Sequence, residues 1–378
     1  MTSVTADPTT HSIGLILSGG GARAAYQVGV LRAIANILPR QAVNPFQVIS
    51  GTSAGALNAV SLATHAQRLR TGVRTLEYVW QNLRSDQVYR LDSGGMLRSA
   101  SGWMLALVGR RPTEAPVALL NNAPLRELLA RTIRLDRIQH NIDTGLLDAV
   151  SVTASSYSSG ESVSFYQAVK GIDNWEGPHR IGIRSRLTLD HLLASSAIPT
   201  IFPAMKIDAQ YFGDGSIRQL APTSTALHLG ARKILAIGVS ATSTRKPPES
   251  MLNRQPSLSQ IIGHILNAAF VDTLENDLEF LRHMNEVLPL VPERRLLRQR
   301  LRHRIVDLLE VTPSRDLNEI AAEYFEDLPR PMKLFVKDPN SAILSLLLFE
   351  PRYCRALMEL GLQDAMAQEA EIRAFFQP

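Results

Sequence analysis

The N-terminal part of the chain alternates between short apolar runs and segments with helical spacing. Residues 13–17 (IGLIL) form a compact apolar run, which is typical of a strand buried on both faces. After a glycine run, aliphatic residues recur at helical spacing over residues 24–38, and a second apolar run at residues 46–49 leads into GTSAG and a small-residue helix. This repeated order of strand, turn and helix predicts parallel strands joined by right-handed crossovers.

Strand and helix patterns continue to the C-terminus. Residues 146–154 predict a strand with a hairpin partner at residues 162–169. Further predicted elements are helices within residues 76–129, a helix at 187–196, strands at 209–212 and 233–240, a linker at 242–256, an amphipathic helical pattern at 258–290, a strand at 304–312 and helices over 342–376. The mixture predicts an α/β fold with a mainly parallel central sheet flanked by helices.

Composition limits the class of protein. Hydrophobic residues make up 45% and charged residues 20% of the 378 residues, which is ordinary for a globular chain and excludes disorder throughout. The net charge of +5, from 40 basic and 35 acidic residues, gives only a weak preference for an anionic partner. Cys354 is the single cysteine and has no partner for an intramolecular disulfide, which fits a reducing compartment.

Residues 51–55 (GTSAG) place a serine between two glycines, directly after a predicted strand. A G-x-S-x-G segment between a strand and a helix is the nucleophile elbow, a strained turn that lifts the serine to the carboxyl edge of the sheet. Gly51 and Gly55 supply the small flanks that this turn needs. The structural alternative is that the glycines only close the turn and Ser53 caps the helix. A nucleophilic Ser53 requires a base, because a serine alcohol is a poor nucleophile at neutral pH.

The first predicted strand, residues 13–17, is followed by a run with three glycines and an arginine: Gly19, Gly20, Gly21 and Arg23. The spacing fits a loose dinucleotide fingerprint. No acidic residue lies between Asp7 and Glu77 to bind a ribose, so only an NADP-like site is compatible with the sequence. One glycine is enough for a tight turn, whereas three leave a row of uncovered N–H groups suited to negative charge. Because these amides lie at the same sheet edge as Ser53, they are candidates for an oxyanion hole.

Histidine and carboxylate side chains are both candidates for the base. The later histidines stand in helical or basic stretches, where packing or surface roles are expected: His228, His264, His283 and His303. Asp214 stands in GDGS directly after a predicted strand, the position at which α/β sheets carry functional residues. Alternatively, Asp214 has a structural role, in which its side chain hydrogen-bonds to the backbone of its own Asp-Gly turn. A buried carboxylate can accept the serine proton itself, so the sequence predicts Asp214 as the base.

Together these segments resemble the patatin-like phospholipases, and in particular their bacterial branch. The resemblance rests on GGGAR at residues 19–23, GTSAG at residues 51–55, the aspartate of GDGS, and the run ASSAIPTIFPA at residues 194–204. Ser216 departs from the glycine or alanine that is usual after the Asp-Gly pair. The resemblance implies a three-layer fold without a metal or other cofactor, and these roles: a Ser53/Asp214 dyad, oxyanion donors at Gly19, Gly20 and Gly21, and loop support from Arg23.

The predicted organisation is a polar tail at residues 1–12, a patatin-like catalytic domain at residues 13–241, and a mostly helical C-terminal extension at residues 257–378 packed on that domain. The resemblance implies a serine lipid acyl hydrolase of the phospholipase A or lysophospholipase type, acting on a phospholipid or lysophospholipid. Two alternatives stay open, a general carboxylesterase and a non-catalytic protein that binds an anionic, NADP-like ligand. No nucleic-acid partner is expected, because no aromatic residue interleaves the basic run at residues 294–304.

Residues 96–111 combine apolar and cationic side chains in a way that suits an interface with anionic lipid. A buried helix with a solvated end is the alternative. The candidates for membrane contact are Trp103, Leu105, Leu107, Arg110 and Arg111. Since no apolar run reaches the ~18 residues of a membrane span and the N-terminus lacks the pattern of a secretory signal, we expect a cytoplasmic protein, soluble or peripheral on the inner face of the membrane.

Overall fold

The computed structural model describes residues 12–90, 118–241, 258–269, 273–292, 304–334 and 336–377. The membrane-contact candidates lie outside these ranges, as do the predicted linker and all of the basic run except Arg304. The strands within the described residues are β1 (Ile13–Leu17), β2 (Val48–Thr52), β3 (Ala149–Ser156), β4 (Ser162–Ala168), β5 (Trp175–Gly177), β6 (Arg180–Arg184), β7 (Met205–Ile207), β8 (Gln210–Asp214), β9 (Lys233–Ile237) and β10 (Asp307–Val311).

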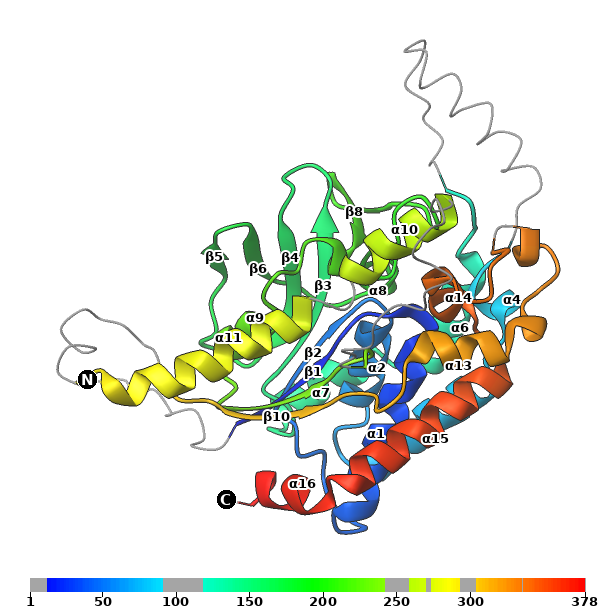
Figure 1. The fold of residues 1–378 in the computed structure, drawn as a ribbon. Coiled ribbons are helices and arrows are strands. Elements are labelled where there is room, and N and C mark those ends of the chain that lie inside the picture. The colour runs from blue at the N-terminus through cyan, green and yellow to red at the C-terminus, as the bar shows by residue number, and fades with distance from the viewer. Residues whose placement is uncertain are drawn as a thin grey trace.

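All ten described strands join one sheet, in the order β10-β9-β1-β2-β3-β4-β6-β5, with β8 paired to β3 and β7 paired to β8 (Figure 1). The first five strands of this order are parallel, and the predicted hairpin β3–β4 is antiparallel. Strands β5, β6 and β7 were missed by the sequence analysis. They are short, and β6 begins and ends with arginine, so that they lack the apolar pattern of a buried strand.

The helices are α1 (Ala25–Ile37), α2 (Ala54–Ala63), α3 (Leu69–Asn82), α4 (Ser85–Val88), α6 (Ala123–Thr132), α7 (Asp136–Asp143), α8 (Leu189–Ser195), α9 (Pro222–His228), α10 (Leu258–Asn267), α11 (Thr273–Val287), α13 (Leu317–Glu323), α14 (Ala342–Leu347), α15 (Pro351–Ala367) and α16 (Glu369–Phe375). Short 3-10 helices include η1 (Gly21–Ala24), η2 (Gly215–Ile217), η6 (Phe325–Asp327) and η7 (Met332–Leu334).

The side chains of the sheet alternate between two cores, which gives the fold three layers. Leu15 and Leu17 pack into the larger core with α1, α2 and α15, whereas Ile16 packs into the smaller core with α9 and α11. This alternation follows from the period of two along a strand, and a strand apolar at every position is buried on both faces. The predicted α/β fold with a mainly parallel sheet flanked by helices is therefore confirmed.

Residues of the predicted C-terminal extension contact the N-terminal layer directly. Helix α15 lies along α1 (Figure 1), and a Cβ atom at Gly361 would lie 2.2 Å from the Tyr26 carbonyl oxygen, so the two backbones approach closely. The Tyr26 hydroxyl donates a hydrogen bond to the Asp364 carboxylate at 3.0 Å. Strand β10 completes one edge of the sheet beside β9. The domain boundaries proposed from the sequence remain a prediction.

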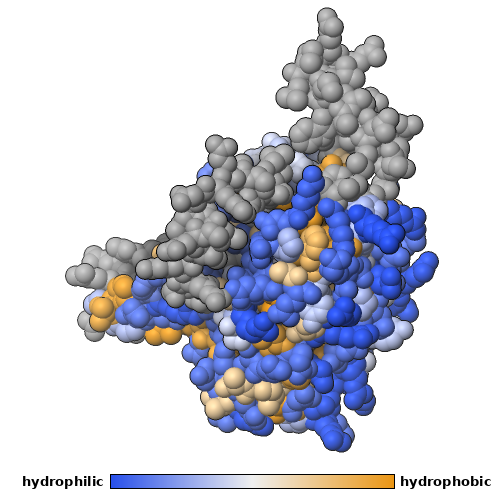
Figure 2. All heavy atoms as spheres, turned by 45° about the vertical axis from the view of Figure 1, so that its right-hand side comes forward, coloured by the Kyte–Doolittle hydropathy of each residue, from blue (hydrophilic) through white to orange (hydrophobic). Residues whose placement is uncertain are grey.

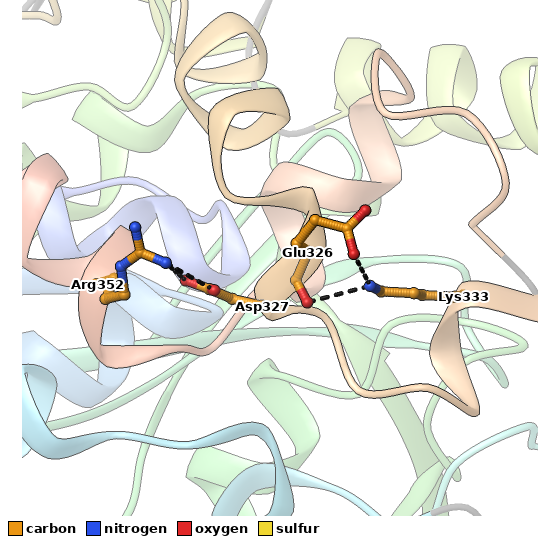
Figure 3. Close-up of polar contacts among 4 residues, drawn as sticks. All are labelled: Glu326, Asp327, Lys333 and Arg352. Atoms are coloured by element: carbon orange, nitrogen blue, oxygen red, sulfur yellow. Dashed lines mark hydrogen bonds and ion pairs between the residues drawn. The ribbon is translucent and has the colours of Figure 1, made fainter.

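Ion pairs tie the turns that precede α14 and α15 (Figure 3). Arg352 near the start of α15 lies 2.9 Å from the Asp327 carboxylate, and the ammonium of Lys333 contacts both the carboxylate and the backbone carbonyl of Glu326. Such exposed pairs contribute at most ~1 kcal/mol each, so they orient these turns more than they stabilise the fold.

The face in Figure 2 is mostly hydrophilic with small apolar patches. No helix among the described residues is long and apolar enough to cross a membrane.

Candidate active site

Ser53 occupies a strained turn between β2 and α2. Its backbone has φ 54° and ψ −131°, in the positive-φ region that residues other than glycine rarely adopt. The side chain is buried and makes no capping hydrogen bond to α2, although Ser53 stands at the N-cap position. The structural alternative of a helix-capping serine is therefore wrong, and the backbone has the strained conformation expected of a nucleophile elbow.

The two glycines of the elbow are required by close contacts of the backbone. A Cβ atom at Gly51 would lie 2.5 Å from the Gly55 carbonyl oxygen. One at Gly55 would lie 2.3 Å from the carbonyl oxygen of Leu17 and 2.4 Å from that of Ser18. Since real Cβ atoms do not approach backbone oxygens so closely, Gly51 allows the end of β2 to touch the start of α2, and Gly55 allows the start of α2 to touch the end of β1.

Asp214 ends β8 and is fully buried. Its Oδ1 accepts a hydrogen bond from the Ser216 N–H at 2.9 Å, so the Asp-Gly turn expected as an alternative role is present. Burial raises the pKa of Asp214 to about 7, and the Ser53 hydroxyl acts against this shift as a neighbouring donor. The other carboxylate oxygen, Oδ2, has no hydrogen-bond partner among the described residues.

The segment around α8 holds Ser53 and Asp214 in place. The Ser53 N–H donates to Ser195 Oγ at 2.9 Å, and Ser195 Oγ donates to the Thr153 carbonyl at 2.6 Å. Two residues further on, the Ala197 carbonyl accepts the Asp214 N–H at 2.8 Å. These roles of Ser195 and Ala197 could not be recognised from the sequence, where both residues belong to the run at 194–204 that resembles the family.

The glycine loop (residues 19–23) lies against the elbow. Gly21 has φ +55° and lines the same cavity as Ser53, whereas Gly19 lines a second, smaller cavity. Within the described residues, the N–H groups of the three glycines donate no hydrogen bond. A Cβ atom at Gly21 would lie 2.2 Å from the Leu346 carbonyl oxygen, so protein backbone already covers this glycine. That close packing disfavours the dinucleotide interpretation, which needs the loop open to a pyrophosphate.

Ser53 lines a largely apolar cavity of about 70 Å³. Side chains from α2, α3, α6 and the end of α14 line it, among them Leu57, Leu76, Trp80, Leu129 and Leu347. Ser61, two helical turns beyond Ser53 on α2, also lines the cavity, which therefore extends roughly 12 Å along this helix. No histidine among the described residues contributes to the lining.

The histidines after Asp214 that the structure describes have other surroundings. The His228 ring stacks on Trp175 with centroids 5.0 Å apart, and its Nδ1 lies 2.7 Å from the Ser224 carbonyl. His264 and His283 are exposed on α10 and α11. Buried His191 pairs with Thr188 at the start of α8, and burial lowers its pKa. By contrast, the Asp214 carboxylate is close enough to Ser53 for the serine hydroxyl to affect its pKa.

Comparison with known proteins agrees with this architecture. The family model described as patatin-like phospholipase matches residues 15–227. A "cGAMP-activated phospholipase" from Pseudomonas aeruginosa is 30% identical over 226 residues, which cover 60% of this chain and 58% of the relative. A protein of the same name from Escherichia coli is 27% identical over 54% of this chain and 51% of its own length. The matched region thus spans little more than half of each relative.

Solved structures give only distant likenesses. VipD from Legionella pneumophila covers 96% of this chain and 67% of its own, with 14% identity and a TM-score of 0.36. Human GIVD cytosolic phospholipase A2, in complex with methyl gamma-linolenyl fluorophosphonate, covers 97% of this chain and 59% of its own, with 14% identity and a TM-score of 0.40. TM-scores this low bear on neither the fold nor the activity.

The family match covers most of the three-layer α/β fold, from β1 to α9. Because the family match covers more than half of the 378 residues, the chain belongs to the patatin-like phospholipase family. The resemblance inferred from GGGAR, GTSAG and the Asp-Gly pair is confirmed.

Proposed function

We propose that this protein is a serine acyl hydrolase that cleaves fatty-acyl ester bonds of phospholipids or lysophospholipids. The observation that carries the proposal is the position of Ser53, which lines an apolar cavity and whose hydroxyl interacts with the buried Asp214 carboxylate. The cavity suits an acyl chain, because apolar walls stabilise buried methylene groups by ~0.8 kcal/mol each. A general carboxylesterase for small soluble esters would gain nothing from a cavity of this depth.

In the proposed reaction, Ser53 Oγ attacks the ester carbonyl carbon while its proton passes to Asp214 Oδ2. The C–O bond to the alcohol then breaks, and the leaving alkoxide takes the proton from Asp214. Water subsequently attacks the acyl-serine, giving its proton to Asp214, and Ser53 recovers a proton as the fatty acid leaves. This sequence needs no imidazole, because a carboxylate with raised pKa is an adequate base for each transfer.

The developing oxyanion would be held by backbone amides. The candidates are the unpartnered N–H groups of Gly19, Gly20 and Gly21, of which Gly21 shares the cavity with Ser53. Ala54, the first residue of α2, is a further candidate that the sequence analysis missed, because the first amides of a helix have no intrahelical partner. Each well-placed donor typically accelerates such a reaction by ~10²–10³-fold.

Defined phospholipids test the proposed substrate. We expect release of free fatty acid from a phosphatidylcholine or its lysophospholipid, detected by mass spectrometry, at rates well above those for an ester of acetate. Ser53→Ala is the control, and it should release no fatty acid. Equal rates on acetate and long-chain esters would reassign the protein as a general carboxylesterase. Failure of a fluorophosphonate probe to label Ser53 would reject an acyl hydrolase altogether.

The pH dependence of turnover tests the base. Asp214 must be ionised to accept the Ser53 proton, and burial raises its pKa to about 7. Since protonation inactivates the base, kcat/KM should rise with pH, reach half of its plateau near pH 7, and be about a hundredfold lower two pH units below that midpoint. An ordinary exposed aspartate would instead give a flat profile above pH 5. Stopped assays on a soluble ester, with folding monitored at each pH, would separate these results.

A further inference from the structure

The guanidinium of Arg23 in the glycine loop is bound by three helices far away in sequence. Arg23 is 2% exposed, and each of its nitrogens donates one hydrogen bond to a neutral oxygen. The acceptors are Ser345 Oγ of α14 at 2.8 Å from Nε, Asn318 Oδ1 of α13 at 2.8 Å from Nη2, and Asn267 Oδ1 of α10 at 3.1 Å from Nη1. No carboxylate among the described residues forms an ion pair with Arg23.

This arrangement makes the position of Arg23 depend strongly on these acceptors. A buried cation is unfavourable unless each of its donors is satisfied, and burial lowers the pKa of Arg23 accordingly. Removing one acceptor leaves a charged donor unpaired in the interior, which is more costly than losing a neutral hydrogen bond. Arg23 would then shift to find a new acceptor or water, and the adjoining glycines of the loop would shift with it.

The acceptors are themselves fixed relative to the loop. Ser345 Oγ accepts from Arg23, and its own proton is directed to Asn318 Oδ1 at 2.9 Å or to the Ala342 carbonyl at 2.8 Å. The next residue, Leu346, presents its carbonyl oxygen to Gly21. One segment of α14 therefore touches both the backbone and the charged side chain of the glycine loop.

The residues that follow Ser345 also belong to the cavity beside Ser53. Leu346, Leu347 and Phe349 line it. The Tyr89 hydroxyl donates to the Leu347 carbonyl at 3.0 Å, and the Ser85 hydroxyl donates to the Phe349 carbonyl at 3.3 Å. These bonds anchor the segment to α4 and the residue after it, so α14 has little freedom to move away from the loop. All of these C-terminal residues lie beyond residue 227, where the family match ends.

We propose that Ser345 and Asn318 are positioning residues for the proposed hydrolysis: by holding the Arg23 guanidinium, they place the amides of Gly19, Gly20 and Gly21 around the oxyanion. The inference rests on the proposed function and adds to it that α13 and α14 complete the oxyanion site. Their effect is on the transition state, because the oxyanion forms only there. Loss of either side chain should therefore lower kcat more than it raises KM.

The chain offers a matched control for this proposal. Ser341, at the N-cap of α14, is also buried, and its hydroxyl has no hydrogen-bond partner within the described residues. Ser345→Ala and Ser341→Ala thus remove the same buried atom from the same helix region. Only the first removes an acceptor of Arg23.

The experiment compares the full-length variants on a soluble ester, with the concentration of folded active sites counted by fluorophosphonate titration. We expect kcat of Ser345→Ala and of Asn318→Ala to fall about ten- to a hundredfold, since a displacement near 1 Å has this effect. KM should stay within about twofold of the wild-type value. Ser341→Ala should keep wild-type kcat, and Ser345→Thr, which retains the hydroxyl, should recover most of it.

Counting folded sites keeps the test decisive when a variant is unstable. A kcat of Ser345→Ala equal to that of Ser341→Ala would overturn the inference while leaving the proposed function intact. Equal losses in Ser345→Ala and Ser345→Thr would also overturn it, because they would indicate general damage to packing. A wild-type protein that does not react with the probe at all would overturn the inference together with the proposed function on which it rests.

Discussion

Asp214→Asn should lower the turnover of an ester substrate by ~10²–10⁴-fold, the usual contribution of a general base. The amide of asparagine is close in shape to the carboxylate and can still accept the Ser216 N–H that Oδ1 accepts in the wild-type protein. It cannot accept a proton from Ser53. The loss should therefore appear in acylation of Ser53, measured as the rate of labelling by a fluorophosphonate probe.

The same substitution should leave the fold intact and at alkaline pH should not reduce its stability. The folded-state pKa of Asp214, about 7, lies above its ordinary value of 3.8. An acid with a raised folded-state pKa contributes its full stability below the unfolded value, and this contribution is lost as pH rises from 3.8 through about 7. At pH 8 the buried carboxylate is mostly charged, whereas asparagine is neutral, so the Tm of the variant should equal or exceed that of the wild type.

If Asp214 is the base, Asp214→Asn should therefore lower the labelling rate without lowering the Tm at pH 8. Thermal unfolding at pH 5 and pH 8, combined with the labelling rate, measures both. A variant that reacts at the wild-type rate would reject the dyad, and another base would then have to be sought. A variant with a strongly reduced Tm at pH 8 would instead assign Asp214 a mainly structural role through its turn.

Gly55→Ala should also lower activity by about a hundredfold, through displacement and not through lost chemistry. Helix propensity alone would favour the substitution, because alanine stabilises a helix by ~1 kcal/mol relative to glycine. The steric term is larger here, since the new Cβ atom would lie 2.3 Å from the Leu17 carbonyl oxygen and 2.4 Å from that of Ser18. The start of α2 must then move away from β1, which separates Ser53 from the glycine loop.

Gly263→Ala in α10 is the matched control. It is also a helical glycine, but its nearest neighbours, on Ala342 and Ile343, would lie 3.5 Å from the new Cβ atom, an ordinary contact. We expect this variant to keep wild-type activity and stability. Probe labelling per folded molecule, with Tm measured in parallel, distinguishes the two glycines. Wild-type labelling of Gly55→Ala would show that the contact between the elbow and β1 does not position Ser53.

Local patterns in the sequence determined most elements that surround the site. Apolar runs predicted β1, β2 and β9, and helical spacing predicted α1, because burial on both faces of a sheet or on one face of a helix imposes these periods. The elbow could also be recognised, since strand, G-x-S-x-G and helix are contiguous in the chain. In each case the physical constraint acts between residues only a few positions apart.

Only the tertiary structure decided which distant residues meet at the site. Ser195 holds the Ser53 N–H across 142 positions, and Ser345 accepts from Arg23 across 322. A single serine or asparagine in a helix carries no local signal of such a partner, because its period and propensity are the same whether it faces solvent or a buried guanidinium. The contacts of α13 and α14 with the glycine loop exist only in the folded chain, and so does the cavity that the end of α14 helps to form beside Ser53.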